Sequence, residues 1–151
     1  MTNNDILRRV RYMLKFSDKK VIEVFKLADL EVSVEQLKGW LRKMDDPELV
    51  EISDRDLATF LNGLIVEKRG RREGPQPEPE ELLTNNIILR KLKIALELTS
   101  DDIIDMCESV NKKLSKHELS AFFRNPNHRS YRTCLDQYLR NIFTALLFKY
   151  K

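Results

Sequence analysis

The side chains best suited to chemistry in this sequence are two cysteines and two histidines in its second half. Cys107, His117, His128 and Cys134 are separated by 10, 11 and 6 residues. Structural zinc sites use about four such ligands, usually in closely spaced pairs, so this spacing would bind a metal only if the tertiary fold gathered it. A nucleophilic cysteine also needs a positioned base. The set favours neither a metal site nor covalent catalysis.

Carboxylate and glycine patterns add no catalytic signal. Asp45-Asp46 precedes a proline and Asp101-Asp102 begins an apolar stripe, so we interpret them as a helix end and a helix start. Adjacent residues on a helix do not share a face, which argues against paired acid–base work. No phosphate-binding loop is formed by the glycines, which are Gly39, Gly63, Gly70 and Gly74. We therefore expect no enzyme activity and no cofactor.

The second half carries a marked excess of positive charge. Residues 83–151 contain 12 basic and 7 acidic side chains, a net +5, whereas residues 1–74 contain 15 and 14, a net +1. Guanidinium groups form paired hydrogen bonds with carboxylate and phosphate oxygens. The candidate binding face consists of Lys116, Arg124, Asn125, His128, Arg129, Tyr131, Arg132 and Arg140. The alternative interpretation is an ordinary solvated face.

An internal repeat organises the elements that position these residues. Residues 2–8 (TNNDILR) return as residues 84–90 (TNNIILR), an offset of 82 residues. This offset continues as far as Arg42, which matches Arg124. Beyond Arg42 the apolar residues align at an offset of 78, which implies a four-residue deletion and pairs Asp56 with Cys134. We interpret the chain as a duplicated unit.

Apolar residues recur with a helical period in both halves. Ile6, Val10 and Leu14 mark the first of four stripes in the first half, and the second half repeats the four. Serines able to cap a first helical turn are Ser17, Ser33, Ser53, Ser100, Ser115 and Ser130. The sequence predicts an all-α protein of two homologous four-helix repeats, residues 1–69 and 83–151. Because units this small have marginal cores, we expect them to pack into one helical body.

The repeats are separated by residues 70–82, which contain three alternating prolines and three glutamates. Proline favours extended chain, so we interpret this segment as a solvated linker. Apolar runs are far shorter than the about 18 residues of a membrane span. The first residues show no secretory signal, and two cysteines suit a reducing compartment. We expect a cytoplasmic protein that does not enter a membrane.

Several of these stretches resemble a known family. The two TNN starts, FLNGL at residues 60–64, FFRNP at 122–126 and YRTC at 131–134 are similar to the YehS-like family of bacterial proteins, a duplicated domain of unknown function. The resemblance covers essentially the whole chain. It implies an all-helical cytoplasmic bacterial protein and transfers no activity. Ile87 departs from the first copy, which has Asp5 at that position.

Two classes of function follow as hypotheses. The leading one is a non-enzymatic binding or interaction protein, whose partner is an unidentified protein or a second copy of the chain. The alternative is a nucleic-acid-binding regulator, in which Ser33 or Ser115 opens the second helix of a helix-turn-helix-like pair and the basic face contacts phosphates. An enzyme with a site between Arg124 and Asp136 is a weaker third class.

Overall fold

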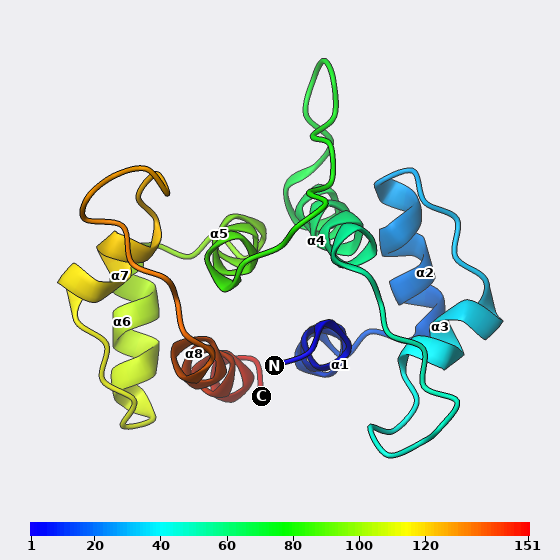
Figure 1. Cartoon of the computed structure of the whole chain (residues 1–151), viewed down its shortest axis with the longest axis horizontal. Helices are drawn as coiled ribbons and strands as arrows, with labels where there is room; N and C mark the ends of the chain where they lie inside the picture. The colour runs from blue at the N-terminus through cyan, green and yellow to red at the C-terminus, as the bar shows by residue number, and fades with distance from the viewer. The chain divides into compact units, whose positions relative to one another are not determined.

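The structure is a computed structural model that describes all of residues 1–151. It contains eight helices and no strand, which confirms the all-α prediction (Figure 1). The helices are α1 (Asn3–Leu14), α2 (Asp18–Leu27), α3 (Val34–Trp40), α4 (Asp54–Arg69), α5 (Asn85–Ala95), α6 (Ser100–Ser109), α7 (Lys116–Phe122) and α8 (Asp136–Lys149). Each helix is too short or too polar to cross a membrane.

The helices fall into two compact units. The first unit comprises residues 1–83 and holds α1–α4, and the second comprises residues 84–151 and holds α5–α8. Two four-helix repeats are therefore confirmed. The packing of the two units against each other stays a prediction.

Hydroxyl side chains begin seven of the eight helices. Ser17, Ser33 and Ser53 each accept the backbone N–H three residues later, as their positions predict. The expected starts at Ser100 and Ser130 are wrong. Thr99 caps α6, and α8 begins only at Asp136, after an extended segment.

The core of the first unit forms where α2 crosses α4. Phe25 of α2 lies 5.4 Å from Trp40 and 5.2 Å from Phe60, measured between ring centroids. A Cβ atom at Gly63 would lie 2.0 Å from the carbonyl oxygen of Val24. Glycine is therefore required at this crossing, because it lets the two backbones approach closely.

Buried asparagines tie the first helix of each unit to the chain that precedes the fourth helix. In the first unit, the Asn4 amide nitrogen donates to the carbonyls of Trp40 at 2.8 Å and Val50 at 2.9 Å. Its oxygen accepts the backbone N–H of Ile52 at 3.2 Å. One side chain thus satisfies three buried backbone groups outside regular structure.

The second unit repeats this arrangement 82 residues later. The Asn86 amide nitrogen donates to the carbonyls of Phe122 at 3.0 Å and Arg132 at 2.8 Å, and its oxygen accepts the N–H of Cys134 at 2.9 Å. The offset of 82 therefore holds beyond Arg42, and the predicted four-residue deletion is wrong. Cys134 corresponds to Ile52, a buried core residue, and not to Asp56.

Left-handed backbone supports the same register. Lys15 and Glu97, 82 residues apart, have φ values of 57° and 54°, and Asp29 and Asn111 have φ values of 64° and 60°. Each follows the first or second helix of its unit, where a left-handed residue turns the chain and lets later N–H groups satisfy the last carbonyls.

The proline-rich segment between the repeats belongs to the first unit. Leu83 donates its backbone N–H to the Asp54 carboxylate at 2.9 Å, and Arg55 forms ion pairs with Glu78 and Glu81. The expected linker at residues 70–82 is thus not free chain between two bodies, because charged groups at the start of α4 hold it.

Candidate anion-binding loop of the second unit

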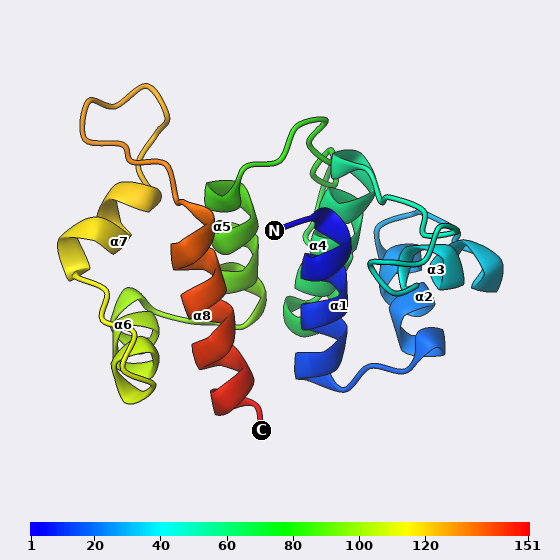
Figure 2. The same cartoon turned by 60° about the horizontal axis from the view of Figure 1, so that its bottom comes forward.

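The connection between α7 and α8 carries most of the predicted binding residues. We call residues 124–132 the basic loop; Figure 2 shows this orange segment extending beyond α7 before the chain returns to α8. The Arg132 N–H donates to the carbonyl of Ala121 at 3.2 Å, and its carbonyl accepts from Asn86. The end of the loop is therefore fixed to the body of the unit.

Two overlapping turns shape the loop between its ends. His128 donates its N–H to the Asn125 carbonyl at 2.8 Å, and Tyr131 donates to the His128 carbonyl at 2.9 Å. The Asn125 side chain accepts the N–H of Asn127 at 2.9 Å, and the His128 Nδ1 accepts that of Ser130 at 3.0 Å. The polar side chains of Asn125 and His128 thus stabilise the turns.

Three arginines remain available for a ligand. Arg124, Arg129 and Arg132 are all exposed and none forms an ion pair or a side-chain hydrogen bond. Each guanidinium keeps its donors for solvent or for an anion. Tyr131 lies among them and is half-buried.

The remaining two predicted residues lie on the flanking helices. Lys116 begins α7, where its Nζ lies 3.8 Å from the Asp101 carboxylate, and both side chains are largely exposed. Such a pair contributes little, so Lys116 is still able to bind another anion. Arg140 lies on α8 and is exposed. The Tyr138 hydroxyl donates to the Glu118 carboxylate at 2.9 Å and thereby links α8 to α7.

The equivalent loop of the first unit has the opposite charge. Residues 42–52 hold two basic and four acidic side chains, whereas residues 124–134 hold three basic and none acidic. Arg42 lies 3.3 Å from Asp46 and 3.4 Å from Glu48.

The partners of Arg42 are replaced in the second unit. At the offset of 82, Arg124 matches Arg42, while His128 and Ser130 stand where Asp46 and Glu48 would. Sequence reasoning missed this replacement because the halves were aligned at 78 beyond Arg42. The repeated asparagines gave the signal that could have corrected it.

The cysteines and histidines do not form a reactive centre. Cys107 and Cys134 are buried, and burial raises the pKa of their thiols to about 11 and about 12. The idea that Arg132 and His128 favour a Cys134 thiolate is therefore wrong, because loss of solvation outweighs the nearby positive charge. No three His, Cys, Asp or Glu side chains gather in a way that could hold a metal ion.

The helix pairs differ from a DNA-reading helix-turn-helix. Six residues, 110–115, connect α6 to α7, and α7 itself has seven residues. Helix-turn-helix motifs use a turn of about three or four residues. The α7 carboxylate of Glu118 accepts both the Tyr138 hydroxyl and the Ser115 N–H, and these hydrogen bonds keep the pKa of that carboxyl below its ordinary value.

These features define a class of protein: a duplicated four-helix protein in which one copy of a shared loop is basic. The family model described as "Protein of unknown function (DUF1456)" matches residues 3–70 and 85–151, and the chain belongs to this family. It is 42% identical over 147 residues to "Uncharacterized protein YehS" of Escherichia coli (strain K12), a match that covers 97% of this chain and 94% of that protein. The comparisons confirm the resemblance seen in the sequence. No solved structure matches the chain.

Proposed function

We propose that the chain is a cytoplasmic, non-enzymatic binding protein whose basic loop contacts an acidic surface of a partner protein. The observation that carries the proposal is the contrast between two equivalent arginines. Arg42 has two carboxylates within 3.4 Å, and Arg124 has none. A carboxylate from a partner would supply the paired hydrogen bonds that Asp46 and Glu48 offer in the first unit.

The distribution of charge supports a protein partner over a nucleic acid. Nucleic-acid binders neutralise many phosphates along a basic stripe. Here the free arginines are confined to one loop, and the exposed residues of α3, the counterpart of α7, include Glu35. A short acidic segment or patch on a folded protein matches a surface of this size.

The decisive variant rebuilds the acidic partners of Arg42 in the second unit. His128→Asp with Ser130→Glu places two carboxylates beside Arg124 while keeping every arginine. We expect the double variant to fold as the wild type does, because both positions are exposed. Immobilised wild-type chain should capture proteins from a nuclease-treated cell extract that this variant fails to capture.

The first unit offers a matched control. Asp46→His with Glu48→Ser changes the same number of charges at the equivalent positions and leaves the basic loop intact, so the captured proteins should remain. Retention of all captured proteins by the His128→Asp, Ser130→Glu variant would contradict the proposal. Capture that disappears on nuclease treatment would support the nucleic-acid alternative instead. Titration with DNA and RNA oligomers would then show binding that weakens steeply with salt.

A further inference from the structure

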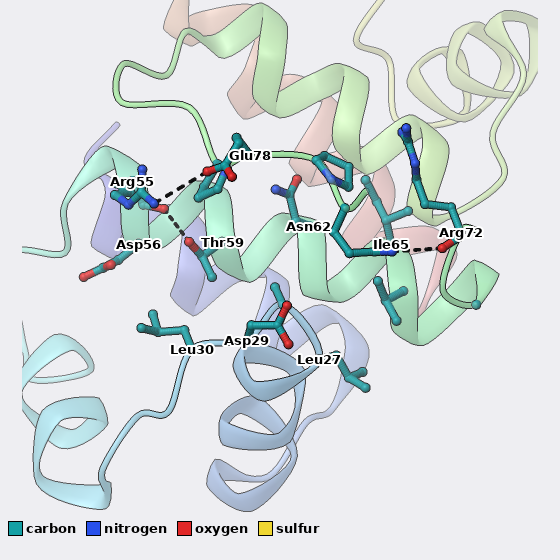
Figure 3. Close-up of a pocket in the computed structure, with 16 residues that line it drawn as sticks. Leu27, Asp29, Leu30, Arg55, Asp56, Thr59, Asn62, Ile65, Arg72 and Glu78 are labelled. Carbon is teal, nitrogen blue, oxygen red and sulfur yellow. Dashed lines mark hydrogen bonds and ion pairs between the residues drawn. The ribbon is translucent and has the colours of Figure 1, made fainter. Parts of the chain in front are cut away.

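The proline-rich segment covers one face of α4 in the first unit. Residues 76–79 lie across this face, and together with α4 and the residues that end α2 they enclose a cavity of about 330 Å³ (Figure 3). The floor includes Leu27, Leu30, Ile65 and Val66. Asn62, on the covered face, is only 7% exposed.

Ionic contacts hold this segment in place. Glu78 lies 3.9 Å from Arg55, and Glu81 also pairs with Arg55, as Figure 3 shows for the first of these contacts. The Gln76 amide donates to the carbonyls of Arg72 at 2.9 Å and Gly74 at 3.1 Å. The alternating prolines lack N–H groups and favour an extended conformation, so the segment lies on the helix without pairing as a strand.

The equivalent face of α8 in the second unit is open. At the offset of 82, Leu147 and Phe148 stand for Ile65 and Val66. Their side chains are 41% and 58% exposed. Thr144, the counterpart of Asn62, is exposed as well. Two large apolar side chains on adjacent positions of one helix thus face solvent where the first unit has a cover.

The rim of this face also changes charge. In the first unit the chain after α2 presents Asp29, Leu30 and Glu31, whereas the chain after α6 presents Asn111, Lys112 and Lys113. Both lysines are exposed and form no ion pair. Two negative charges are replaced by two positive ones beside the exposed apolar residues. This rim complements an acidic segment.

We propose that the face of α8 formed by Thr144, Leu147 and Phe148 binds an extended, acidic, proline-containing segment of a partner protein. Its prolines would cover Leu147 and Phe148, and its carboxylates would pair with Lys112 and Lys113. The first unit shows this kind of segment on the equivalent helix, with Arg55 as its cationic anchor. The proposal does not depend on the basic loop.

A fluorescent peptide with the sequence of residues 73–83 of this chain tests the proposal. Titration of the full chain into the peptide, followed by fluorescence anisotropy, should give saturable binding. Leu147→Ser with Phe148→Ser should weaken binding by about tenfold or more, which corresponds to the removal of about 1.4 kcal/mol of apolar contact. Lys112→Glu with Lys113→Glu should weaken it as well, while Ile94→Ser, a change at a similarly exposed apolar residue of α5, should leave it unchanged.

The outcomes separate this proposal from that for the basic loop. No binding, or equal binding by the Leu147→Ser, Phe148→Ser variant, would overturn it. Loss of binding only in the His128→Asp, Ser130→Glu variant would overturn it too, and would place the acidic peptide on the basic loop. Concentration-dependent self-association that the α8 variant abolishes, without peptide binding, would show that a second copy covers the face and would also overturn it.

Discussion

Asn86 fixes the position of Cys134: its side-chain oxygen accepts the Cys134 backbone N–H at 2.9 Å. The same amide group also donates to two carbonyls in the chain around the basic loop. In the first unit Asn4 does this for the backbone around Ile52. These buried amides determine where the chain enters the fourth helix of each unit, and they hold the basic loop in its place.

Replacing Asn86 should destabilise the second unit. Asn86→Ala leaves two carbonyls and one N–H without their partner. We expect a loss of about 2–4 kcal/mol in the free energy of unfolding, since each unsatisfied buried group costs about 1–3 kcal/mol and water recovers part of that. Urea denaturation followed by circular dichroism measures the loss.

An exposed asparagine serves as the control for that measurement. Asn127→Ala removes an amide from the basic loop, where only its backbone takes part in a hydrogen bond. Its effect should stay within about 0.5 kcal/mol. Equal effects of Asn86→Ala and Asn127→Ala would show that the buried amide does not hold the unit together.

The close contact between α2 and α4 predicts a strong effect of one methyl group. Gly63→Ala would place a Cβ atom 2.0 Å from the backbone oxygen of Val24, so the helices must separate. We expect a loss of about 3 kcal/mol or more, the upper range for overpacking. The second unit already has Ala145 at this position, and Ala145→Gly should cost only about 1 kcal/mol through helix propensity and a lost methyl group. Thermal unfolding of both variants checks the asymmetry.

The hydrogen bond between Tyr138 and Glu118 predicts a dependence on pH. Its hydroxyl lowers the pKa of the Glu118 carboxyl, so Tyr138→Phe should raise that pKa toward its ordinary value of 4.5. Because the folded-state pKa is lowered, the stabilisation exists above pH 4.5 and is lost as the pH falls through the folded-state value. The wild type should therefore lose its advantage over Tyr138→Phe in acid.

Nuclear magnetic resonance titration of the Glu118 side-chain carboxyl measures this pKa directly. An unchanged Glu118 pKa in Tyr138→Phe would show that the Ser115 cap alone sets it.

Both thiols should be inert in the folded protein. With pKa values raised to about 11 and about 12, Cys107 and Cys134 are almost wholly protonated at neutral pH. Reaction with a disulfide reagent at about pH 8 should be more than about 100-fold slower in the native chain than in urea. Rapid labelling of the native chain would contradict their burial.

The same thiols should lower stability at high pH. A raised folded-state pKa stabilises the fold fully below the ordinary value of 9.0 and less as the pH rises toward about 12. Cys134→Val should therefore show a smaller loss of unfolding free energy between about pH 8 and about pH 10 than the wild type does. Matched urea denaturations at the two pH values provide the comparison.

Helical periodicity and capping residues in the sequence were sufficient to predict eight helices in two repeats. Apolar spacing reports which residues face a core, and Ser17, Ser33, Ser53 and Ser115 begin helices as expected. These signals are local, because they depend on residues three or four positions apart. The excess positive charge of the second half is likewise a property of composition.

The register of the second repeat needed tertiary contacts. An offset of 78 differs from 82 by four residues, about one helical turn, so the apolar stripes of α4 and α8 match nearly as well in either alignment. Only the contacts of Asn86 with chain 36 to 48 residues away distinguish them. For this reason the sequence placed the start of α8 too early and misassigned Cys134.

Tertiary structure also decided which charges are free. The sequence contains Arg42 and Arg124 at matched positions, but it does not show that carboxylates neutralise the first and leave the second exposed. Nor does it show that residues 76–79 cover α4 while the equivalent face of α8 stays open. Ion pairing and burial depend on distances between side chains that the fold alone sets, whereas helices follow from neighbouring residues.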